Sequence, residues 1–126
     1  MTSGRQIEAK PYDLEERTYR FALVTRLFLK RQSWDPASWP DVRQLLRSSG
    51  SVAANYVEFI EGLSGDDKTY RLRISKKEAR ESGLWLRLLS DCNSLPPESA
   101  AELRELKQES DELVRILAAI IRKRVS

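Results

Sequence analysis

Two pairs of glutamates have the residue type and the spacing to do chemistry. Glu58 and Glu61 form one pair, and Glu78 and Glu81 form the other. Residues three positions apart share one side of a helix, so each pair would present two carboxylates together. Carboxylate oxygens are the ligands that Mg²⁺ prefers, and four of them on adjacent helices could hold this ion. The sequence therefore leaves open a magnesium-dependent enzyme that uses these four glutamates.

A structural interpretation of Glu78 and Glu81 competes with the metal site. At about 100° per residue, both fall in the middle of an apolar helix face. That face consists of Tyr70, Ile74, Trp85 and Leu88. A buried carboxylate needs a partner, because leaving it unpaired is costly. Arg47 and Asn55, along one edge of the preceding helix, offer a guanidinium and an amide. We therefore expect a structural polar network of Arg47, Asn55, Glu78 and Glu81.

Two alternatives to this network remain open at this point. The second glutamate pair could border the core with its carboxylates in water, or it could belong to the metal site. The metal site is disfavoured because the first pair lies off the apolar stripe of its helix, whereas the second lies on its own stripe. Bringing all four carboxylates together would require a helix rotation that exposes Phe59 or Val52. We accordingly expect no metal ion, no cofactor and no catalytic residue.

The absence of histidine narrows the chemistry further. The 126 residues include no histidine and one cysteine, Cys92. Ser-His-Asp and Cys-His nucleophiles, histidine-containing zinc sites and general-base histidines are excluded. A single cysteine cannot form an internal disulfide, which favours a reducing compartment. Residues 1–10 are polar and contain no signal sequence. These features predict a soluble, cytoplasmic protein without a membrane partner.

Basic residues gather on one face of the third expected helix and at the end of the chain. The first group is Arg73, Lys76, Lys77, Arg80 and Arg87, and the second is Arg122, Lys123 and Arg124. The usual explanation of such a run is a solvated surface. A face of one sign also suits phosphate groups, so these eight residues are the candidate nucleic-acid contacts. The formal net charge of +3 is too small to decide between the two.

Four amphipathic helices are expected to position these residues. Apolar periodicity, proline and glycine punctuation and capping signals place them at about 13–32, 40–61, 66–91 and 97–124, after a flexible lead-in at 1–11. Asp13 and Ser64 are the expected N-caps of the first and third helices. The fourth helix has a regular stripe of Leu103, Leu106, Ser110, Leu113, Leu117 and Ile120.

Short connections between these helices favour an all-α, antiparallel up-down-up-down four-helix bundle that forms a single domain over 1–126. Two other arrangements are open. One is a pair of helical hairpins that closes only on dimerising, and the other is a three-helix core with a detached first helix.

More apolar surface is present than one four-helix core can cover. Leu23, Val24 and Leu27 lie outside the main stripe of the first helix. A second stripe of small and apolar residues runs along the third helix and consists of Leu72, Ser75, Ala79, Ser82 and Leu86. In the second helix, Gly50 suggests the close approach of a neighbouring backbone. The surplus apolar surface of the first and third helices leads us to expect a closed cyclic homo-oligomer.

Several segments in the same order resemble a known bacterial family. They are Tyr12-Asp-Leu-Glu-Glu-Arg-Thr18, Leu45-Leu-Arg-Ser-Ser-Gly-Ser51, Ala54-Asn-Tyr-Val-Glu58, Lys77-Glu-Ala-Arg-Glu-Ser82 and Trp85-Leu-Arg-Leu-Leu89. Together they are similar to the four-helix-bundle proteins of 23S rRNA intervening sequences, also called the S23 family. The resemblance implies a left-handed up-down bundle that assembles as a homopentamer. A related branch, the accessory protein of diversity-generating retroelements, implies contact with RNA and with a reverse transcriptase.

The resulting hypothesis is a non-enzymatic, self-assembling helical bundle that acts as a scaffold or accessory factor and binds RNA or a reverse-transcriptase-type protein. The alternative enzyme resembles the all-α nucleotide pyrophosphohydrolases, whose magnesium-binding carboxylates the two glutamate pairs loosely match. It would use Glu58, Glu61, Glu78 and Glu81.

Overall fold

The computed structural model describes residues 14–126, and these residues fold into four long helices. They are α2 (Leu14–Arg31), α3 (Trp39–Glu61), α4 (Gly65–Cys92) and α5 (Pro97–Val125), with one short 3₁₀ turn, η2 (Pro36–Ser38). The predicted all-α class is confirmed. The expected lead-in at 1–11 and the expected cap Asp13 lie outside the described residues.

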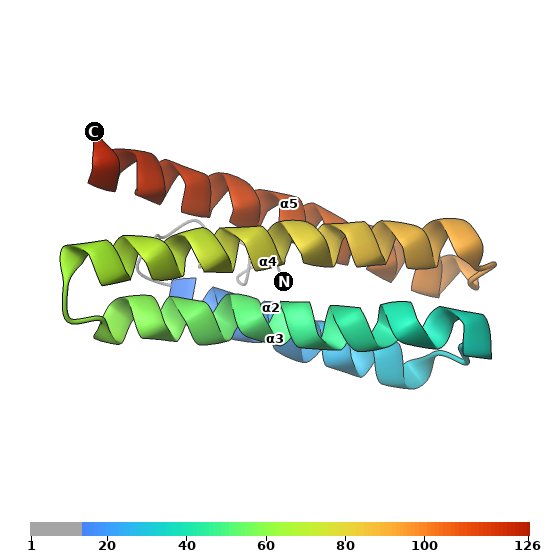
Figure 1. Ribbon diagram of the computed structural model, residues 1–126. Helices are drawn as coiled ribbons and strands as arrows, with labels where there is room; N and C mark the ends of the chain where they lie inside the picture. The colour runs from blue at the N-terminus through green and yellow to red at the C-terminus, as the bar shows by residue number, and fades with distance from the viewer. Residues whose placement is uncertain (1–13) are drawn as a thin grey trace.

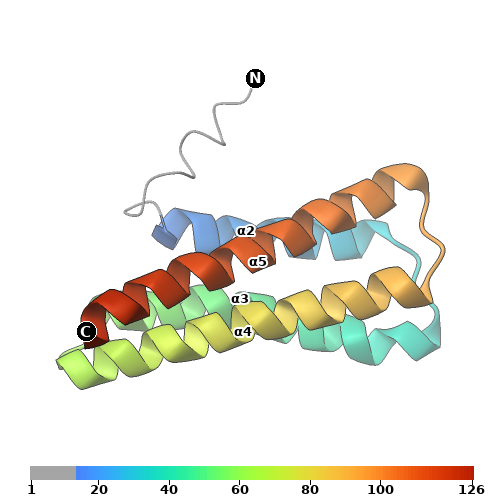
Figure 2. The ribbon, with the colours of Figure 1, turned by 90° about the horizontal axis from the view of Figure 1, so that it is seen from above.

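Consecutive helices run in opposite directions and form a bundle (Figures 1 and 2). α3 packs along α4, α4 along α5, and α2 along α3 with a smaller contact to α5. α2 and α4 therefore lie diagonally across the bundle. Contacts between helix ends agree with these directions, because Arg31 at the end of α2 pairs with Glu102 near the start of α5. Likewise, Arg124 at the end of α5 donates to the carbonyl of Gly65 at the start of α4.

Local sequence signals account for where the helices begin and end. The hydroxyl of Ser64 accepts a hydrogen bond of 3.0 Å from the backbone N–H of Asp67, which confirms Ser64 as the N-cap of α4. Pro40 and Pro97 stand in the first turns of α3 and α5, where a missing N–H costs nothing. At the other end of α3, the ammonium of Lys68 donates to the carbonyls of Phe59 and Ile60.

The core face of α4 differs from the expected one. Tyr70 is 58% exposed, and Ile74, Trp85 and Leu88 are only partly buried. The residues of α4 that are completely buried are Leu72, Ser75, Ala79, Ser82, Leu86 and Leu89. Small side chains let the backbones of α3 and α5 come close on both sides of α4, and the larger apolar residues flank this contact. The face that we assigned to the core is thus its border.

This arrangement corrects two further predictions. The small-residue stripe, expected to meet another subunit, is used inside the bundle. Gly50 does not admit a neighbouring backbone but the side chain of Arg26 from α2, whose Nη2 would lie 2.9 Å from a Cβ at this position. Arg26 donates from there to the carbonyl of Leu46 and to the hydroxyl of Ser49.

α2 and α5 bury most of the residues that periodicity selects. α2 buries Leu14, Phe21, Thr25 and Phe28, and α5 buries the predicted leucines and Ser110, with Ile121 in place of Ile120 at its end. Within residues 14–126, no helix is both long and apolar enough to cross a membrane.

Candidate nucleic-acid interface and the neighbouring polar network

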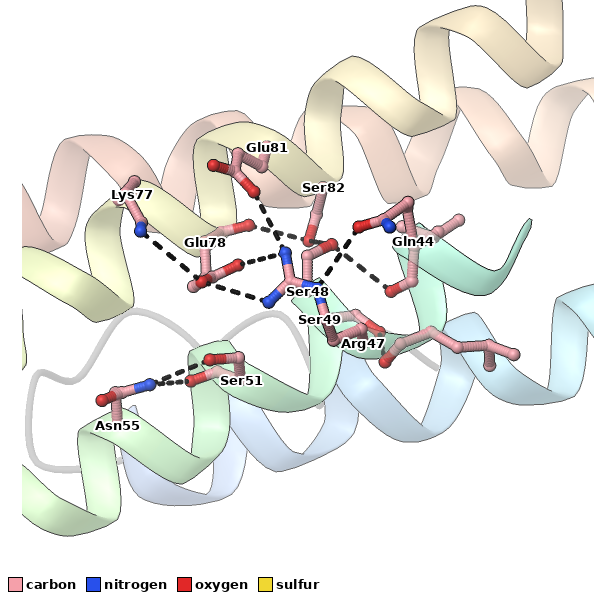
Figure 3. A network of polar contacts seen from close by, with 12 residues as sticks. Gln44, Arg47, Ser48, Ser49, Ser51, Asn55, Lys77, Glu78, Glu81 and Ser82 are labelled. Carbon is pink, nitrogen blue, oxygen red and sulfur yellow. Dashed lines mark hydrogen bonds and ion pairs between the residues drawn. The ribbon is translucent and has the colours of Figure 1, made fainter. Parts of the chain in front are cut away.

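Arg47 of α3 pairs with both glutamates of α4 (Figure 3). Its guanidinium donates to the two carboxylate oxygens of Glu78 at 3.2 and 3.3 Å, and to Glu81 at 3.2 Å. The hydrogen bonds to Glu78 raise the pKa of Arg47, with a smaller contribution from Glu81. Glu78 is buried, but the side chain of Arg47 is 51% exposed and that of Glu81 is 38% exposed. The network therefore bridges α3 and α4 at the surface, with only one of its two carboxylates buried.

Asn55 does not take part in this network. Its amide nitrogen donates to the carbonyl and the hydroxyl of Ser51, one turn earlier in α3. Its amide oxygen accepts a hydrogen bond of 3.3 Å from Arg71. Asn55 and Arg71 thus form a second link between α3 and α4, closer to the loop that joins these helices. The inclusion of Asn55 with Arg47 was wrong, because the Asn55 amide bonds to Ser51 and Arg71 instead.

Buried serines form the inner part of the contact between α3 and α4. The hydroxyls of Ser48 and Ser82 lie 2.8 Å apart (Figure 3), and the hydroxyl of Ser75 donates to the carbonyl of Val52 at 2.8 Å. Ser82 in turn donates to the carbonyl of Glu78, on its own helix. Each hydroxyl is fully buried and satisfied, as buried polar groups must be. The signal in the sequence was the repeated serine in phase with Leu72 and Ala79.

A second ion-pair network, which sequence reasoning missed, joins α2 to α5. Arg17 is 7% exposed and donates to Glu109 at 2.7 and 2.9 Å and to Glu112 at 2.7 Å. Hydrogen bonding to Glu109 raises the pKa of Arg17, while burial opposes this shift. The available signal was an arginine in phase with the apolar stripe, between Leu14 and Phe21.

The structure does not gather the four glutamates of the alternative enzyme. Glu58 and Glu61 are exposed on α3, whereas Glu78 and Glu81 turn to Arg47. Across residues 14–126, no three acidic, cysteine or histidine side chains are placed to hold a metal ion. The grouping of Glu58 and Glu61 with Glu78 and Glu81 was therefore wrong, because the observed helix rotation directs the two pairs to different surroundings.

The basic residues of α4 lie on its outer side. Arg73, Lys77, Arg80 and Arg87 are exposed, and Lys76 is partly exposed. Lys77 lies 3.9 Å from the carboxylate of Glu78, and Arg87 lies 3.9 Å from that of Asp91. Within the described part of the chain, Arg73, Lys76 and Arg80 form no ion pair. The positive charge in the middle of this face is therefore not cancelled by a neighbouring carboxylate.

The basic end of α5 lies against the beginning of α4. Arg124 donates from Nε to the hydroxyl of Thr69 at 3.1 Å and from Nη2 to the carbonyl of Gly65 at 3.2 Å. Its guanidinium also lies 5.5 Å from the ring centre of Phe59, a favourable cation–π distance. Arg122 and Lys123 are exposed beside it. Three contacts thus fix Arg124 without neutralising it.

Arg124 and Arg73 line the same hollow, although Arg73 lies early in α4 and Arg124 lies in the last turn of α5. The hollow has a volume of about 540 Å³ and is bordered by the first three turns of α4 and the last turn of α5. It brings one member of each basic group together, which the sequence alone could not predict.

The sequence profile of one family, described as "23S rRNA-intervening sequence protein", matches residues 36–119. The chain belongs to this family. The matched span contains α3, α4 and most of α5, and so includes Arg47, Glu78, Glu81 and the basic residues of α4. Arg122, Lys123 and Arg124 follow the end of the matched span.

A member of the S23 ribosomal protein family has a similar structure. It is a protein of unknown function from Bacteroides thetaiotaomicron VPI-5482, solved by crystallography at 1.70 Å resolution. The two chains are 27% identical, with a TM-score of 0.70, and the match covers 85% of this chain and 96% of the other. No curated protein gives a significant match to the sequence. The comparisons therefore establish the family and the bundle without supplying an activity.

Proposed function

We propose that this member of the 23S rRNA-intervening sequence protein family is a non-enzymatic, self-assembling bundle that binds RNA through a continuous basic belt. The belt consists of Arg73, Lys76, Lys77, Arg80, Arg87, Arg122, Lys123 and Arg124. The observation that carries the proposal is the hollow that Arg73 of the first basic group and Arg124 of the second line together.

The polar network supports this proposal by removing negative charge from the outer side of α4. Glu78 and Glu81 are the acids nearest in sequence to Lys77 and Arg80, and both are paired with Arg47 from α3. Glu78 is also buried, which keeps its carboxylate away from any ligand. A phosphate approaching the middle of the belt would therefore meet mainly cations that form no ion pair within the described residues. Such contacts give binding that depends steeply on salt and only weakly on sequence.

Self-assembly is supported by the outer side of α2. Tyr19 is 54% exposed and Leu27 is 44% exposed, with the partly buried Leu23 midway between them. These residues recur every four positions, so they form one apolar stripe. We propose that this stripe contacts another subunit, and that the assembly is the homopentamer implied by the S23 resemblance. A cyclic assembly would repeat the belt around its axis and so strengthen binding to a long RNA.

Charge reversal within the belt tests RNA binding. The double variant Lys76→Glu, Arg80→Glu should weaken binding to a structured RNA at low salt by at least about tenfold and flatten the salt dependence, because two phosphate contacts are lost. The readout is fluorescence anisotropy with a labelled RNA over a salt series. The matched control is Arg20→Glu, Lys30→Glu, which changes the net charge equally on exposed positions of α2.

Light scattering should give the same mass for both variants and the parent. Equal weakening by the two double variants would reduce the belt to a general charge effect. Unchanged binding in Lys76→Glu, Arg80→Glu would contradict the belt, and the scaffold would then need a protein partner, such as the reverse-transcriptase-type protein that the S23 resemblance implies.

A further inference from the structure

We propose that the hollow between the start of α4 and the end of α5 holds an unpaired nucleotide, with its base stacked on Tyr70 and its phosphate between Arg73 and Arg124. This inference rests on the proposed RNA binding and specifies what the belt recognises. Such a site would bind a single-stranded segment or a bulge more tightly than a regular duplex.

The first observation is an aromatic ring where no core requires one. Tyr70 is 58% exposed and does not belong to the hydrophobic core. The guanidinium of Arg71 lies 5.7 Å from the ring centre, and Arg71 is itself held by Asn55. The ring therefore has a supported side and also borders the hollow. A base that enters the hollow would extend this stack of Arg71 and Tyr70.

The second observation is the position of two cations around the same space. Arg73, one turn after Tyr70 on α4, has no carboxylate partner within residues 14–126. Arg124 reaches the hollow from α5 and is already held by Gly65 and Thr69. A guanidinium that is held in place loses little side-chain freedom when it binds phosphate. The hollow thus combines one aromatic surface with two positive charges, of which Arg124 is held in place and Arg73 is unpaired.

Size and lining also fit a nucleotide. A volume of about 540 Å³ falls within the range of small-molecule sites. Val125, which is 57% exposed, adds an apolar surface beside Tyr70. Aromatic rings combined with basic side chains are the usual means of binding single strands, because every base has a π-face. In a regular duplex the bases are stacked on each other, so their faces are not available to stack on Tyr70.

Asp66 supplies the one negative charge in the lining and makes a second test available. It is exposed and forms no ion pair among the described residues. Its carboxylate repels a phosphate held by Arg73 and Arg124. Asp66→Asn should therefore strengthen binding, and the gain should shrink as salt is raised.

The experiment compares two labelled RNAs of equal length, one without secondary structure and one as a blunt duplex, using the full chain. Tyr70→Ala should weaken binding of the single strand by about fivefold or more, which is the low end for removing one aromatic–base stack. Binding of the duplex should be unchanged. Tyr70→Phe keeps the ring without its hydroxyl and should bind the single strand as the parent does. Circular dichroism melting confirms that each variant is folded.

The outcomes separate this inference from the proposed function. Equal binding of both RNAs by Tyr70→Ala and the parent would overturn the stacking site while leaving the belt intact. Equal weakening for both RNAs would also overturn it, since Tyr70 would then be a general contact. If Tyr70→Ala weakens binding of the single strand while Lys76→Glu, Arg80→Glu binds RNA as the parent does, the stacking site is supported and the belt is overturned. A parent chain that binds neither RNA would overturn both proposals.

Discussion

Arg47 illustrates how the exposure of a single side chain sets the strength of an ion pair. Its guanidinium serves two carboxylates, of which only Glu78 is buried. A buried carboxylate that loses its partner costs about 3–5 kcal/mol, whereas an exposed pair contributes about 0–1 kcal/mol. Because half of the Arg47 side chain is in contact with water, water can replace some of the hydrogen bonds that the guanidinium donates to Glu78.

Arg47→Ala should lower the free energy of unfolding by about 1–2 kcal/mol, between these two ranges. Urea unfolding followed by circular dichroism measures the loss. Arg43→Ala, one turn earlier on the exposed side of α3, is the matched control and should cost less than about 0.5 kcal/mol. If Arg47→Ala costs no more than Arg43→Ala, water satisfies Glu78 fully. A loss above about 3 kcal/mol would mean that Glu78 is left dry.

The sequence identified the partners of Glu78 and Glu81 but not their exposure or the partner of Asn55. A carboxylate in phase with apolar residues requires a cation nearby, and Arg47 lies in the corresponding position on the preceding helix. The hydrogen bonds of Asn55 depend on a finer detail of the packing, because Arg71 and not Arg47 faces its amide oxygen. Such a difference follows from the rotation and offset of two helices, which periodicity does not determine.

At the scale of helices, the contact between α3 and α4 depends on small side chains. Ser48, Ser75 and Ser82 are completely buried, and their hydroxyls are satisfied across or within the helices. Weighing residues by size and hydrophobicity favoured the face of Tyr70 and Trp85, because serine and alanine add little to an apolar stripe. Close packing instead favours small residues, because they let two helix backbones approach each other. The same reasoning succeeded for α5, where leucines dominate the buried stripe.

Ser82→Leu should destabilise the bundle by about 1–3 kcal/mol or more, because its larger side chain has no room between α3 and α4. Ser82→Ala should cost less, since it removes one hydroxyl and leaves Ser48 with its weaker bond to Leu45. Ser90→Leu, on the exposed side of the same helix, controls for the added leucine and should be nearly neutral. Thermal melting ranks the three variants. A Ser82→Leu protein as stable as Ser90→Leu would show that the helices can separate at no cost.

For the whole molecule, the corrected faces change the argument for assembly. The stripe of Leu72, Ala79 and Leu86 is used within the bundle, so it cannot also contact another subunit. The apolar stripe of Tyr19, Leu23 and Leu27 on α2 remains. The bundle and its helix directions could be anticipated from four amphipathic segments with short connections. The surface that remains apolar could not be anticipated from the sequence, because it depends on which face each helix buries.

Light scattering of the parent chain should give a mass that is a multiple of 14.5 kDa, with five subunits as the expected number. Leu27→Asp should shift the population to the monomer, because a carboxylate would have to be buried in the subunit contact. Leu63→Asp, at a fully exposed position between α3 and α4, is the control and should keep the mass of the parent. A monomer mass for the parent across a wide concentration range would contradict self-assembly.

The length of α4 sets a known distance between its two ends. The hollow begins at Gly65, and the single cysteine of the chain, Cys92, is exposed at the other end of the same helix. At 1.5 Å per residue, the two ends are roughly 40 Å apart. A thiol-reactive dye would therefore attach at one known point on each subunit, far from the basic residues at the other end of α4. Energy transfer from that dye to an acceptor on either end of an RNA strand would report the polarity with which the strand crosses α4.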